Sequence, residues 1–251
     1  MYKLGLIGRS LEHSFSKKYF DKKFAEEKNN LFTYHLFNLQ DLTRLQNIDD
    51  STLIGFNVTS PYKKKIIHHL DELDILAEKT QSVNTVFVNP KNKKTTGYNT
   101  DIFGFEKLLN HLSLEQDIKA LILGSGGVSN TVSYVLNKKN IKYRIVSRQQ
   151  KKNMLIYENL VDYFDDFKLI INTTPLGQYP HLNNYPNIPY HLISDTHQCI
   201  DLIYNPAKTI FLKKVEKKGA KIFNGYEMLI TQAEESFLIW KKCLKKIGCI
   251  N

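Results

Sequence analysis

This sequence of 251 residues contains few cysteines and no long apolar run. Its three cysteines, Cys199, Cys243 and Cys249, are odd in number and lack metal-site spacing, which excludes a disulfide framework and indicates a reducing compartment. The N-terminus enters a strand-like segment without the apolar stretch of a signal peptide, and no apolar run is long enough to cross a membrane. We therefore expect a cytoplasmic protein that binds neither a membrane nor a metal ion.

The positive charge of the chain lacks the clustering that is typical of nucleic-acid binding. Lysine and arginine number 35 against 25 aspartates and glutamates, which gives a net charge of +10 and a pI near 9.3. The basic residues are mostly lysines in small scattered groups, without an arginine-rich arm or a basic stripe interleaved with aromatic residues. This scatter favours a general enrichment in lysine over a nucleic-acid partner, and an anionic small molecule is the other interpretation of the charge.

A polar segment follows a short apolar strand expected at residues 54–58. Alternation places Asn57 and Thr59 on one face of that strand. Ser60-Pro61 is typical of a helix start, which puts Lys63 in the first helical turn, where the helix dipole disfavours its charged form. Open α/β sheets bind ligands at such strand ends, and a lysine in this setting suits acid–base chemistry. A solvated lysine in a lysine-rich chain is the alternative.

Hydroxyl and acidic side chains follow other expected strands in the same half of the chain. Ser14 and Ser16 lie in the loop between a strand at residues 4–7 and a helix at about 17–27, where they can bind a carboxylate or phosphate, or Ser16 can simply cap the helix. Asn84 begins a strand expected at 83–88, which forms a hairpin with 95–98. Asp101 precedes an amphipathic helix, either as its cap or as a partner of Lys63.

A glycine-rich turn marks the second half of the chain, after a link at residues 113–119. Ala120 to Leu123 is typical of a strand, and Gly124-Ser125-Gly126-Gly127-Val128-Ser129-Asn130 leads from it into a helix. Such a turn lets the backbone and the helix N–H groups approach a pyrophosphate. The third glycine of the dinucleotide pattern is here Ser129.

The residues after the next strand, expected at 143–146, favour NADP over NAD. NAD-binding domains carry a carboxylate here for the ribose 2′-hydroxyl, and none is present. Arg148, with Lys151 and Lys152 nearby, suits the 2′-phosphate of NADP instead. An exposed basic turn is the alternative.

These motifs, taken in order, resemble the shikimate dehydrogenase family from end to end. Any one of them is weakly specific, but chance would rarely produce them all in one sequence. The motifs that carry the resemblance are Ser14-x-Ser16, Asn57-Val58-Thr59-x-Pro61-x-Lys63, Val83-Asn84-Thr85, Asn99-Thr100-Asp101, Gly124-Ser125-Gly126-Gly127, Asn172-Thr173-Thr174-Pro175-Leu176-Gly177 and Gly225-x-x-Met228-Leu229-x-x-Gln232.

The resemblance implies an NADP-dependent, reversible reduction of 3-dehydroshikimate to shikimate, a step of chorismate and aromatic amino acid biosynthesis. It implies a mixed α/β substrate-binding domain at 1–101 completed by a C-terminal helix at 225–251, a Rossmann NADP-binding domain at 102–224, and a cleft between them. A quinate/shikimate enzyme that prefers NAD and a non-catalytic ligand-binding paralogue are the alternatives. The partner is a small-molecule substrate rather than nucleic acid or a membrane, and the chain could act as a monomer or a homodimer.

The resemblance also implies the roles of individual residues. Lys63 and Asp101 would be the catalytic pair. Ser14 and Ser16 would bind the substrate carboxylate. Asn84, Asp101 and Gln232 would bind the ring hydroxyls, and Thr59 and Tyr204 would line the pocket. The cofactor residues would be Gly124, Ser125, Gly126, Gly127, Val128, Ser147, Arg148, Thr173, Gly225 and Met228.

Three positions depart from the family pattern, and none of them carries chemistry. Lys17 stands where a proline is usual after the second serine, which loosens the helix start. Ser147-Arg148-Gln149 replaces the usual Asn-Arg-Thr turn, which puts the strength of cofactor binding in doubt. Gln178 stands where a methionine is common.

Overall fold

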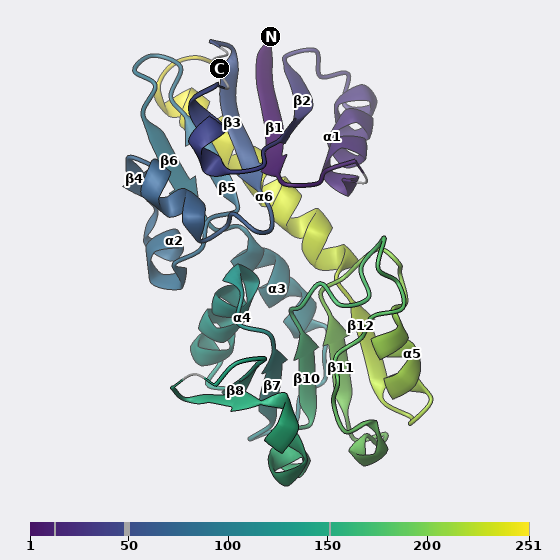
Figure 1. Ribbon diagram of the computed structural model, residues 1–251. Helices are drawn as coiled ribbons and strands as arrows, with labels where there is room; N and C mark the ends of the chain where they lie inside the picture. Colours follow the sequence, from purple (N-terminus) through teal and green to yellow (C-terminus); the bar gives the residue numbers. More distant parts are fainter. Residues whose placement is uncertain (13, 48–50, 151, 251) are drawn as a thin grey trace. The chain divides into compact units, whose positions relative to one another are not determined.

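The computed structural model describes residues 1–12, 14–47, 51–150 and 152–250 (Figure 1). Lys151 lies outside the described residues. The chain divides into two compact units: unit 1 comprises Met1–Thr100 with Ala233–Asn251, and unit 2 comprises Asp101–Gln232. Within the described residues, no helix combines the length and the apolarity that a membrane crossing demands.

Unit 1 is built on a mixed six-stranded sheet in the order β2-β1-β3-β5-β6-β4. Strands β1, β2 and β3 are parallel, β5 runs antiparallel to β3, and β6 runs antiparallel to β5. The carboxyl ends of β1–β3 and β6 and the amino end of β5 therefore share one edge, which we call the site edge of unit 1. The strands are β1 Tyr2–Gly8, β2 Phe32–Asn38, β3 Leu53–Val58, β4 Glu72–Leu73, β5 Thr85–Val88 and β6 Thr95–Tyr98.

Helix α6 packs on this sheet through Trp240, which is completely buried. The indole N–H of Trp240 donates a hydrogen bond to the Val86 carbonyl at 2.9 Å. A Cβ atom at Gly55 would lie 2.3 Å from the indole nitrogen, so only glycine permits this approach. Ala233, Phe237 and Leu244, at helical spacing with Trp240, lie in the same core of unit 1. The helices of unit 1 are α1 Phe15–Glu26, η1 Leu42–Asn47, η2 Lys65–His69, α2 Ile75–Thr80 and the second part of α6 Tyr226–Lys246.

One helix expected in unit 1 is absent, and another is shorter than expected. The α-helix expected to start at Pro61 is replaced by turns, with a cis Ser60–Pro61 peptide, and a short 3₁₀ helix begins only at Lys65. The sequence also predicts a helical segment at 71–80, and the structure shortens it. Asp74 caps the Leu76 N–H at 2.9 Å and so starts α2 there, while Glu72–Leu73 pairs with β6 as β4.

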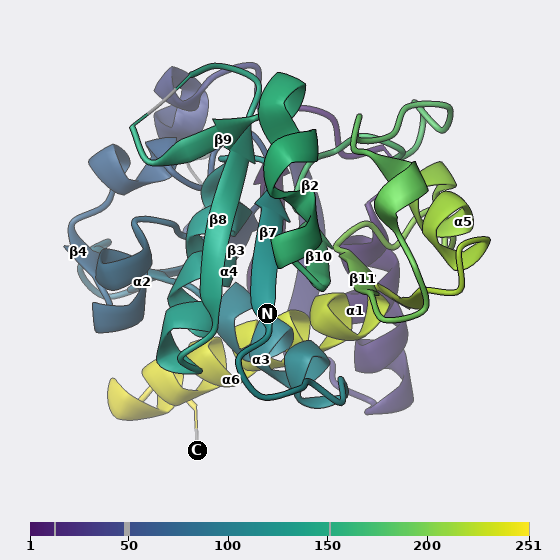
Figure 2. The ribbon, with the colours of Figure 1, turned by 90° about the horizontal axis from the view of Figure 1, so that it is seen from below.

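Unit 2 is built on an all-parallel sheet in the order β12-β11-β10-β7-β8-β9. Figure 2 shows β8, β7, β10 and β11 of this sheet side by side. The order is that of the Rossmann fold, with its switch point between β7 and β10, and it confirms the predicted fold class. The strands are β7 Lys119–Leu123, β8 Lys142–Ser147, β9 Met154–Ile156, β10 Leu169–Asn172, β11 Gln198–Asp201 and β12 Lys221–Asn224.

The helices of unit 2 connect these strands, and their apolar residues form a separate core with the sheet. Neither β9 nor the 3₁₀ helix after it was predicted. The strand is short and only half-buried, so it carries no strong apolar pattern. The helices are α3 Asp101–Asn110, α4 Gly127–Lys138, η3 Tyr157–Asp166, η4 Tyr190–Leu192, α5 Ile210–Glu216 and the first part of α6.

A buried carboxylate joins the ends of β10 and β11. Asp201 accepts hydrogen bonds from the Asn172 amide at 3.0 Å, the Ile203 N–H at 3.1 Å and the Thr209 hydroxyl at 2.6 Å. Burial raises the pKa of Asp201 to about 6 from an ordinary value of 3.8, although these hydrogen bonds act in the opposite direction. The neutral acid is therefore favoured in the folded state relative to the unfolded chain.

We expect Asp201 to make stability depend on pH in a direction unusual for an aspartate. Because its folded-state pKa is raised, its contribution is fully present below about pH 4 and is lost as the pH rises through about 6. As the pH rises over this range, the wild type should lose about 1–3 kcal/mol of unfolding free energy relative to Asp201→Asn, which lacks the titrating carboxyl. Chemical denaturation of both proteins at several pH values measures this difference, and a difference that is constant or rises with pH would contradict the prediction.

Candidate active site

The two serines predicted to bind a carboxylate lie at the start of α1, on the site edge of unit 1. Ser14 occupies the N-cap position of α1, and its side chain makes no capping hydrogen bond. Ser16 lies within the first turn and is half-buried, so the alternative that Ser16 caps the helix is wrong. The Ser16 hydroxyl instead acts on the phenol of Tyr34 in β2, where it works to lower the pKa that burial raises. Both serines therefore follow β1 directly, as the sequence indicated.

Thr59 and Lys63 follow β3 on the same edge, and both are half-buried. The Thr59 N–H donates to the Ile7 carbonyl at 3.0 Å, and the Lys63 carbonyl accepts from the Val83 N–H at 2.8 Å. Lys63 thus lies in a turn fixed to the segment before β5. Its expected position in the first turn of an α-helix is wrong. The expected effect of that helix's dipole on the charge of Lys63 is therefore wrong as well.

Asn84 and Thr100 join the start of β5 to the chain segment after β6. Asn84 is 2 % exposed, and its side-chain oxygen accepts from the Thr100 N–H at 2.7 Å while its amide donates to the Thr100 hydroxyl at 2.9 Å. Asp101 comes next in the chain, is 3 % exposed and is the first residue of α3. It therefore lies inside the first turn, where the helix dipole favours a carboxylate, rather than at the capping position.

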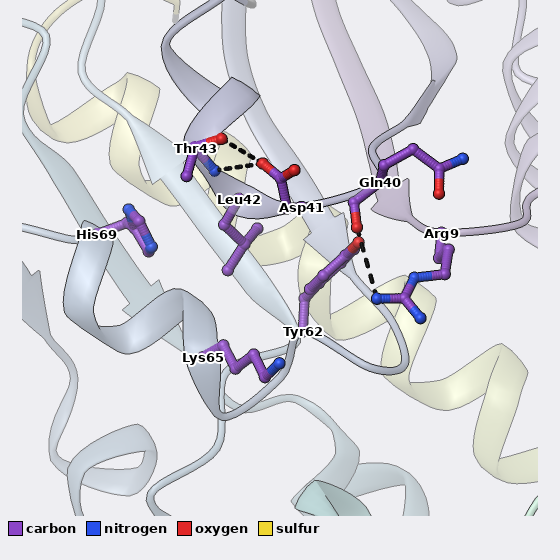
Figure 3. Close-up of a pocket in the computed structure, with 8 residues that line it drawn as sticks. All are labelled: Arg9, Gln40, Asp41, Leu42, Thr43, Tyr62, Lys65 and His69. Atoms are coloured by element: carbon purple, nitrogen blue, oxygen red, sulfur yellow. Dashed lines mark hydrogen bonds between the residues drawn. The ribbon is translucent and has the colours of Figure 1, made fainter.

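A separate pocket of about 220 Å³ opens on unit 1 and contains none of the predicted site residues. Figure 3 shows the Arg9 guanidinium beside the Gln40 carbonyl, Asp41 hydrogen-bonded to Thr43, and Lys65 and His69 extending from η2. Its charged side chains are all exposed, and both signs of charge are present. The lining residues are Arg9, Gln40, Asp41, Leu42, Thr43, Tyr62, Lys65 and His69.

The glycine-rich turn of unit 2 has the geometry of an anion cradle. Gly124 has a φ of +107°, and a Cβ there would lie 2.9 Å from the Thr173 hydroxyl oxygen, so this position requires glycine. Gly126 forms the N-cap of α4, with no acidic residue in the first turn and open space where a side chain would stand. The N–H groups of Gly127 and Val128 begin this helix, so the turn fits a pyrophosphate.

Two neighbouring positions of this turn also support the cradle. Ser125 stands beside Gly124 and Gly126 in the turn itself. Ser129 stands where the dinucleotide pattern has its third glycine, and it is completely buried. A small residue is needed there because α4 packs closely on the sheet.

Arg148 lies at the carboxyl end of β8, exposed and without a carboxylate beside it in the sequence. The buried Ser147 hydroxyl accepts from the Gln149 N–H at 3.3 Å and so turns the chain after the strand. Burial raises the pKa of Tyr157 to about 12, and the positive charge of nearby Arg148 acts in the opposite direction. The guanidinium therefore lies close to the start of η3, next to the strand end where a 2′-phosphate would bind.

The other predicted cofactor residues lie at strand ends or on α6. The Thr173 hydroxyl donates to the Leu123 carbonyl at 2.7 Å, which ties the end of β10 to the glycine-rich turn. Gly225 requires glycine, because a Cβ would lie 2.1 Å from the Leu202 carbonyl oxygen. Met228 is buried against Gly104 of α3.

The last two predicted substrate residues, Tyr204 and Gln232, are both half-buried. Gln232 lies on α6, and its side-chain amide donates to the Leu229 carbonyl at 2.9 Å. Among the residues that the structure describes, no group of three or more His, Cys, Asp or Glu side chains is placed to hold a metal ion. Sequence reasoning assigned no role to Tyr34, Thr85 and Ser236, which hydrogen-bond Asn57 or Asn84 in the interior. Thr85 lies in the Val83-Asn84-Thr85 motif, whereas Tyr34 and Ser236 belong to no motif in the sequence.

The comparison with known proteins agrees with this geometry. Residues 6–86 match the family model described as the shikimate dehydrogenase substrate binding domain. A shikimate dehydrogenase (NADP(+)) of Methanococcus maripaludis is 37 % identical over 94 % of this chain and 91 % of its own length.

Solved structures give the same result. Shikimate dehydrogenase 1 from Peptoclostridium difficile is 33 % identical with a TM-score of 0.84, covering 96 % of this chain and 92 % of that one. A shikimate dehydrogenase in complex with NADP+ is 30 % identical with a TM-score of 0.82, covering 96 % and 90 %. With its motifs in place along nearly its whole length, the chain belongs to the shikimate dehydrogenase family.

Proposed function

We propose that this protein is an NADP-dependent dehydrogenase that interconverts 3-dehydroshikimate and shikimate in the cytoplasm. The observation that carries the proposal is similarity to an NADP-dependent shikimate dehydrogenase over 94 % of the chain. The residues that the chemistry needs are kept, with Lys63 on the site edge of unit 1 and Arg148 at the end of β8. The three free thiols of Cys199, Cys243 and Cys249 support a reducing compartment. The partner is a small molecule, and both a monomer and a homodimer are compatible with the proposal.

Substrate binding is assigned to the site edge of unit 1 and the residues next to it. Ser14 and Ser16 would hold the carboxylate through their hydroxyls. Asn84, Asp101 and Gln232 would hydrogen-bond the ring hydroxyls, with Thr59 and Tyr204 lining the pocket. The side chain of Asn84 is already fixed by Thr100, so binding would not have to order it.

Cofactor binding is assigned to unit 2, whose strand ends supply the residues. The amide groups at the start of α4 would hold the pyrophosphate, and Arg148 the 2′-phosphate. Ser147, Thr173, Gly225 and Met228 would complete the surface, with Met228 near the nicotinamide. The pyrophosphate residues are Gly124, Ser125, Gly126, Gly127 and Val128.

The chemistry requires a hydride and a proton, and the chain supplies the means to handle the proton. NADPH, when bound, supplies the hydride that reduces the ketone carbon. Lys63 Nζ would donate a proton to the oxygen, where negative charge develops, or stabilise that charge as a cation. The Asp101 carboxylate would hold a substrate hydroxyl and act with Lys63 as a unit.

A spectrophotometric assay of NADP reduction tests the proposed function. We expect the purified protein to oxidise shikimate with NADP, with far lower kcat/KM when NAD replaces NADP or quinate replaces shikimate. Shikimate oxidation and quinate oxidation should be compared with each cofactor. Equal or better use of quinate with NAD would favour the dual-substrate alternative, and inactivity with all four combinations would favour a non-catalytic paralogue.

Substitution of the catalytic pair tests the mechanism. Lys63→Ala should lower kcat by about 10²–10⁴-fold with a smaller change in KM, because a lost acid–base group affects mainly the chemical step. Asp101→Asn should lower kcat and raise the KM for shikimate. If the residues act as a unit, the double variant should be much less impaired than the product of the single losses. Lys64→Ala removes the same charge from the next residue and serves as the control.

Multiplicative losses in that double-mutant cycle would argue against joint action. Normal turnover of Lys63→Ala would exclude Lys63 from the mechanism.

Arg148→Ala tests the choice of cofactor. A charged contact to a phosphate contributes about 1.5–3 kcal/mol, so the KM for NADP should rise by roughly ten- to a hundredfold. The KM for NAD should change little, because NAD lacks the 2′-phosphate. Arg144→Ala, which removes an exposed arginine from the same strand, is the matched control. An equal rise for both cofactors would show that Arg148 does not select NADP.

A further inference from the structure

Three buried hydroxyl groups meet beneath α6, next to the site edge of unit 1. The Ser236 hydroxyl oxygen lies 2.7 Å from that of Thr85 and 3.0 Å from that of Thr100, and the two threonine oxygens are 3.3 Å apart. All three residues are completely buried. They come from α6, from the first position of β5 and from the segment after β6, so the cluster joins parts of the chain that are far apart in sequence.

On one side, this hydroxyl cluster contacts Asn84. Its member Thr100 directly precedes Asp101. The side-chain oxygen of Asn84 accepts from the Thr85 hydroxyl at 3.1 Å and from the Thr100 hydroxyl at 3.1 Å, besides the Thr100 N–H. Thr100 is thus fixed through both its backbone and its side chain. Because Asp101 follows it directly, the position of the Asp101 backbone depends on the same contacts.

On the other side, the cluster reaches Asn57 and, beyond it, the carboxylate-binding loop. The Asn57 amide nitrogen lies 2.9 Å from the Ser236 hydroxyl and 3.1 Å from the Thr85 hydroxyl. The Asn57 oxygen accepts from the Tyr34 phenol at 2.8 Å. The Ser16 hydroxyl lies on the other side of this phenol and acts to lower its pKa, against the effect of burial. A continuous series of hydrogen bonds therefore runs from Tyr34, beside Ser16, to Asn84.

The members of this series support one another because water is excluded. An uncompensated polar group is costly in a buried environment, and loss of one member leaves its neighbours unsatisfied or lets them rotate. Ser236 contacts Asn57, Thr85 and Thr100 at once, and it is the member that α6 contributes, so its loss disturbs three partners on the sheet side of the helix. It also lies about one helical turn beyond Gln232 on α6 and so shares its face of the helix.

We propose that Ser236 is a positioning residue for the dehydrogenase reaction. Through Thr85 and Thr100, its hydroxyl fixes Asn84, which binds the substrate, and the start of the helix that carries Asp101. Through Asn57 it also fixes the Tyr34 phenol, beside which Ser16 lies. The inference rests on the proposed function, because it assigns those groups to substrate binding. Ser236 itself need not touch the substrate.

Removal of hydroxyl groups one at a time tests this inference. Ser236→Ala should lower kcat/KM for shikimate by about 10- to 100-fold, since small displacements of binding groups have effects of that size. The KM for NADP should stay within about twofold, because the proposed cofactor residues all lie in unit 2. If Ser236 served only the folding of unit 1, Ser236→Ala would lower the thermal stability, while kcat/KM for shikimate and the KM for NADP would both stay near the wild-type values.

A matched pair at Thr85 keeps the test decisive if Ser236→Ala folds poorly. Thr85→Val keeps the shape and removes the hydroxyl, so it should show the same selective loss. Thr85→Ser keeps the hydroxyl and should recover most of the activity. Ser82→Ala is the control: its hydroxyl is buried in the same unit and has no hydrogen-bond partner among the described residues, so its removal should leave kinetics near those of the wild type.

The outcomes separate this inference from the proposed function. If the wild type oxidises shikimate but Ser236→Ala and Thr85→Val match Ser82→Ala in kcat and both KM values, the inference is overturned and the function stands. A general loss that Thr85→Ser shares also overturns it. A wild type that does not oxidise shikimate with NADP overturns both.

Discussion

Helix α6 can lie against the sheet of unit 1 only because position 55 has no side chain. The Trp240 ring occupies the space that a Cβ at Gly55 would fill, and its N–H satisfies the Val86 carbonyl. This contact fixes the distance between helix and sheet. The Ser236 hydroxyl, about one turn before Trp240, is then close enough to reach Thr85 and Thr100. A single glycine in the middle of a strand therefore determines whether the polar interior beneath α6 can satisfy its own hydrogen bonds.

The strands and the glycine-rich turn could be predicted because their signals are local. Buried parallel strands are continuous apolar runs, and the turn at Gly124 needs a backbone conformation that favours glycine. The segment after β3 could not be predicted in this way. Tyr62 is buried with its hydroxyl donating to the Leu39 carbonyl at 2.6 Å, and the Lys63 carbonyl accepts from Val83. The first contact holds the Tyr62 side chain, and the second takes up a backbone carbonyl that a helix would have used, so tertiary contacts override the helix-start signal of Ser60-Pro61.

The candidate site shows a similar division between what motifs reveal and what only the fold reveals. Motifs in the sequence indicate that Asn84 and Asp101 belong to the site, and the pairing of β5 with β6 shows why Asn84 and the residue before Asp101 meet. Nothing in the sequence links Tyr34, Thr85 and Ser236, because a serine in an amphipathic helix has the same pattern whether it faces a threonine or a solvent molecule. Only the packing of α6 on the sheet brings these supporting residues together.

The buried series from Tyr34 to Asn84 contains only hydroxyl and amide side chains. Burial raises the pKa of Tyr34 well above its ordinary value, so this phenol stays neutral at physiological pH. Hydrogen bonds between neutral groups in a dry interior are not weakened by added salt, and they do not change with acidity near neutrality. The polar interior beneath α6 is therefore insulated from the ionic conditions of the solution, and a response to those conditions is left to the charged groups of the candidate site, such as Lys63, Asp101 and Arg148.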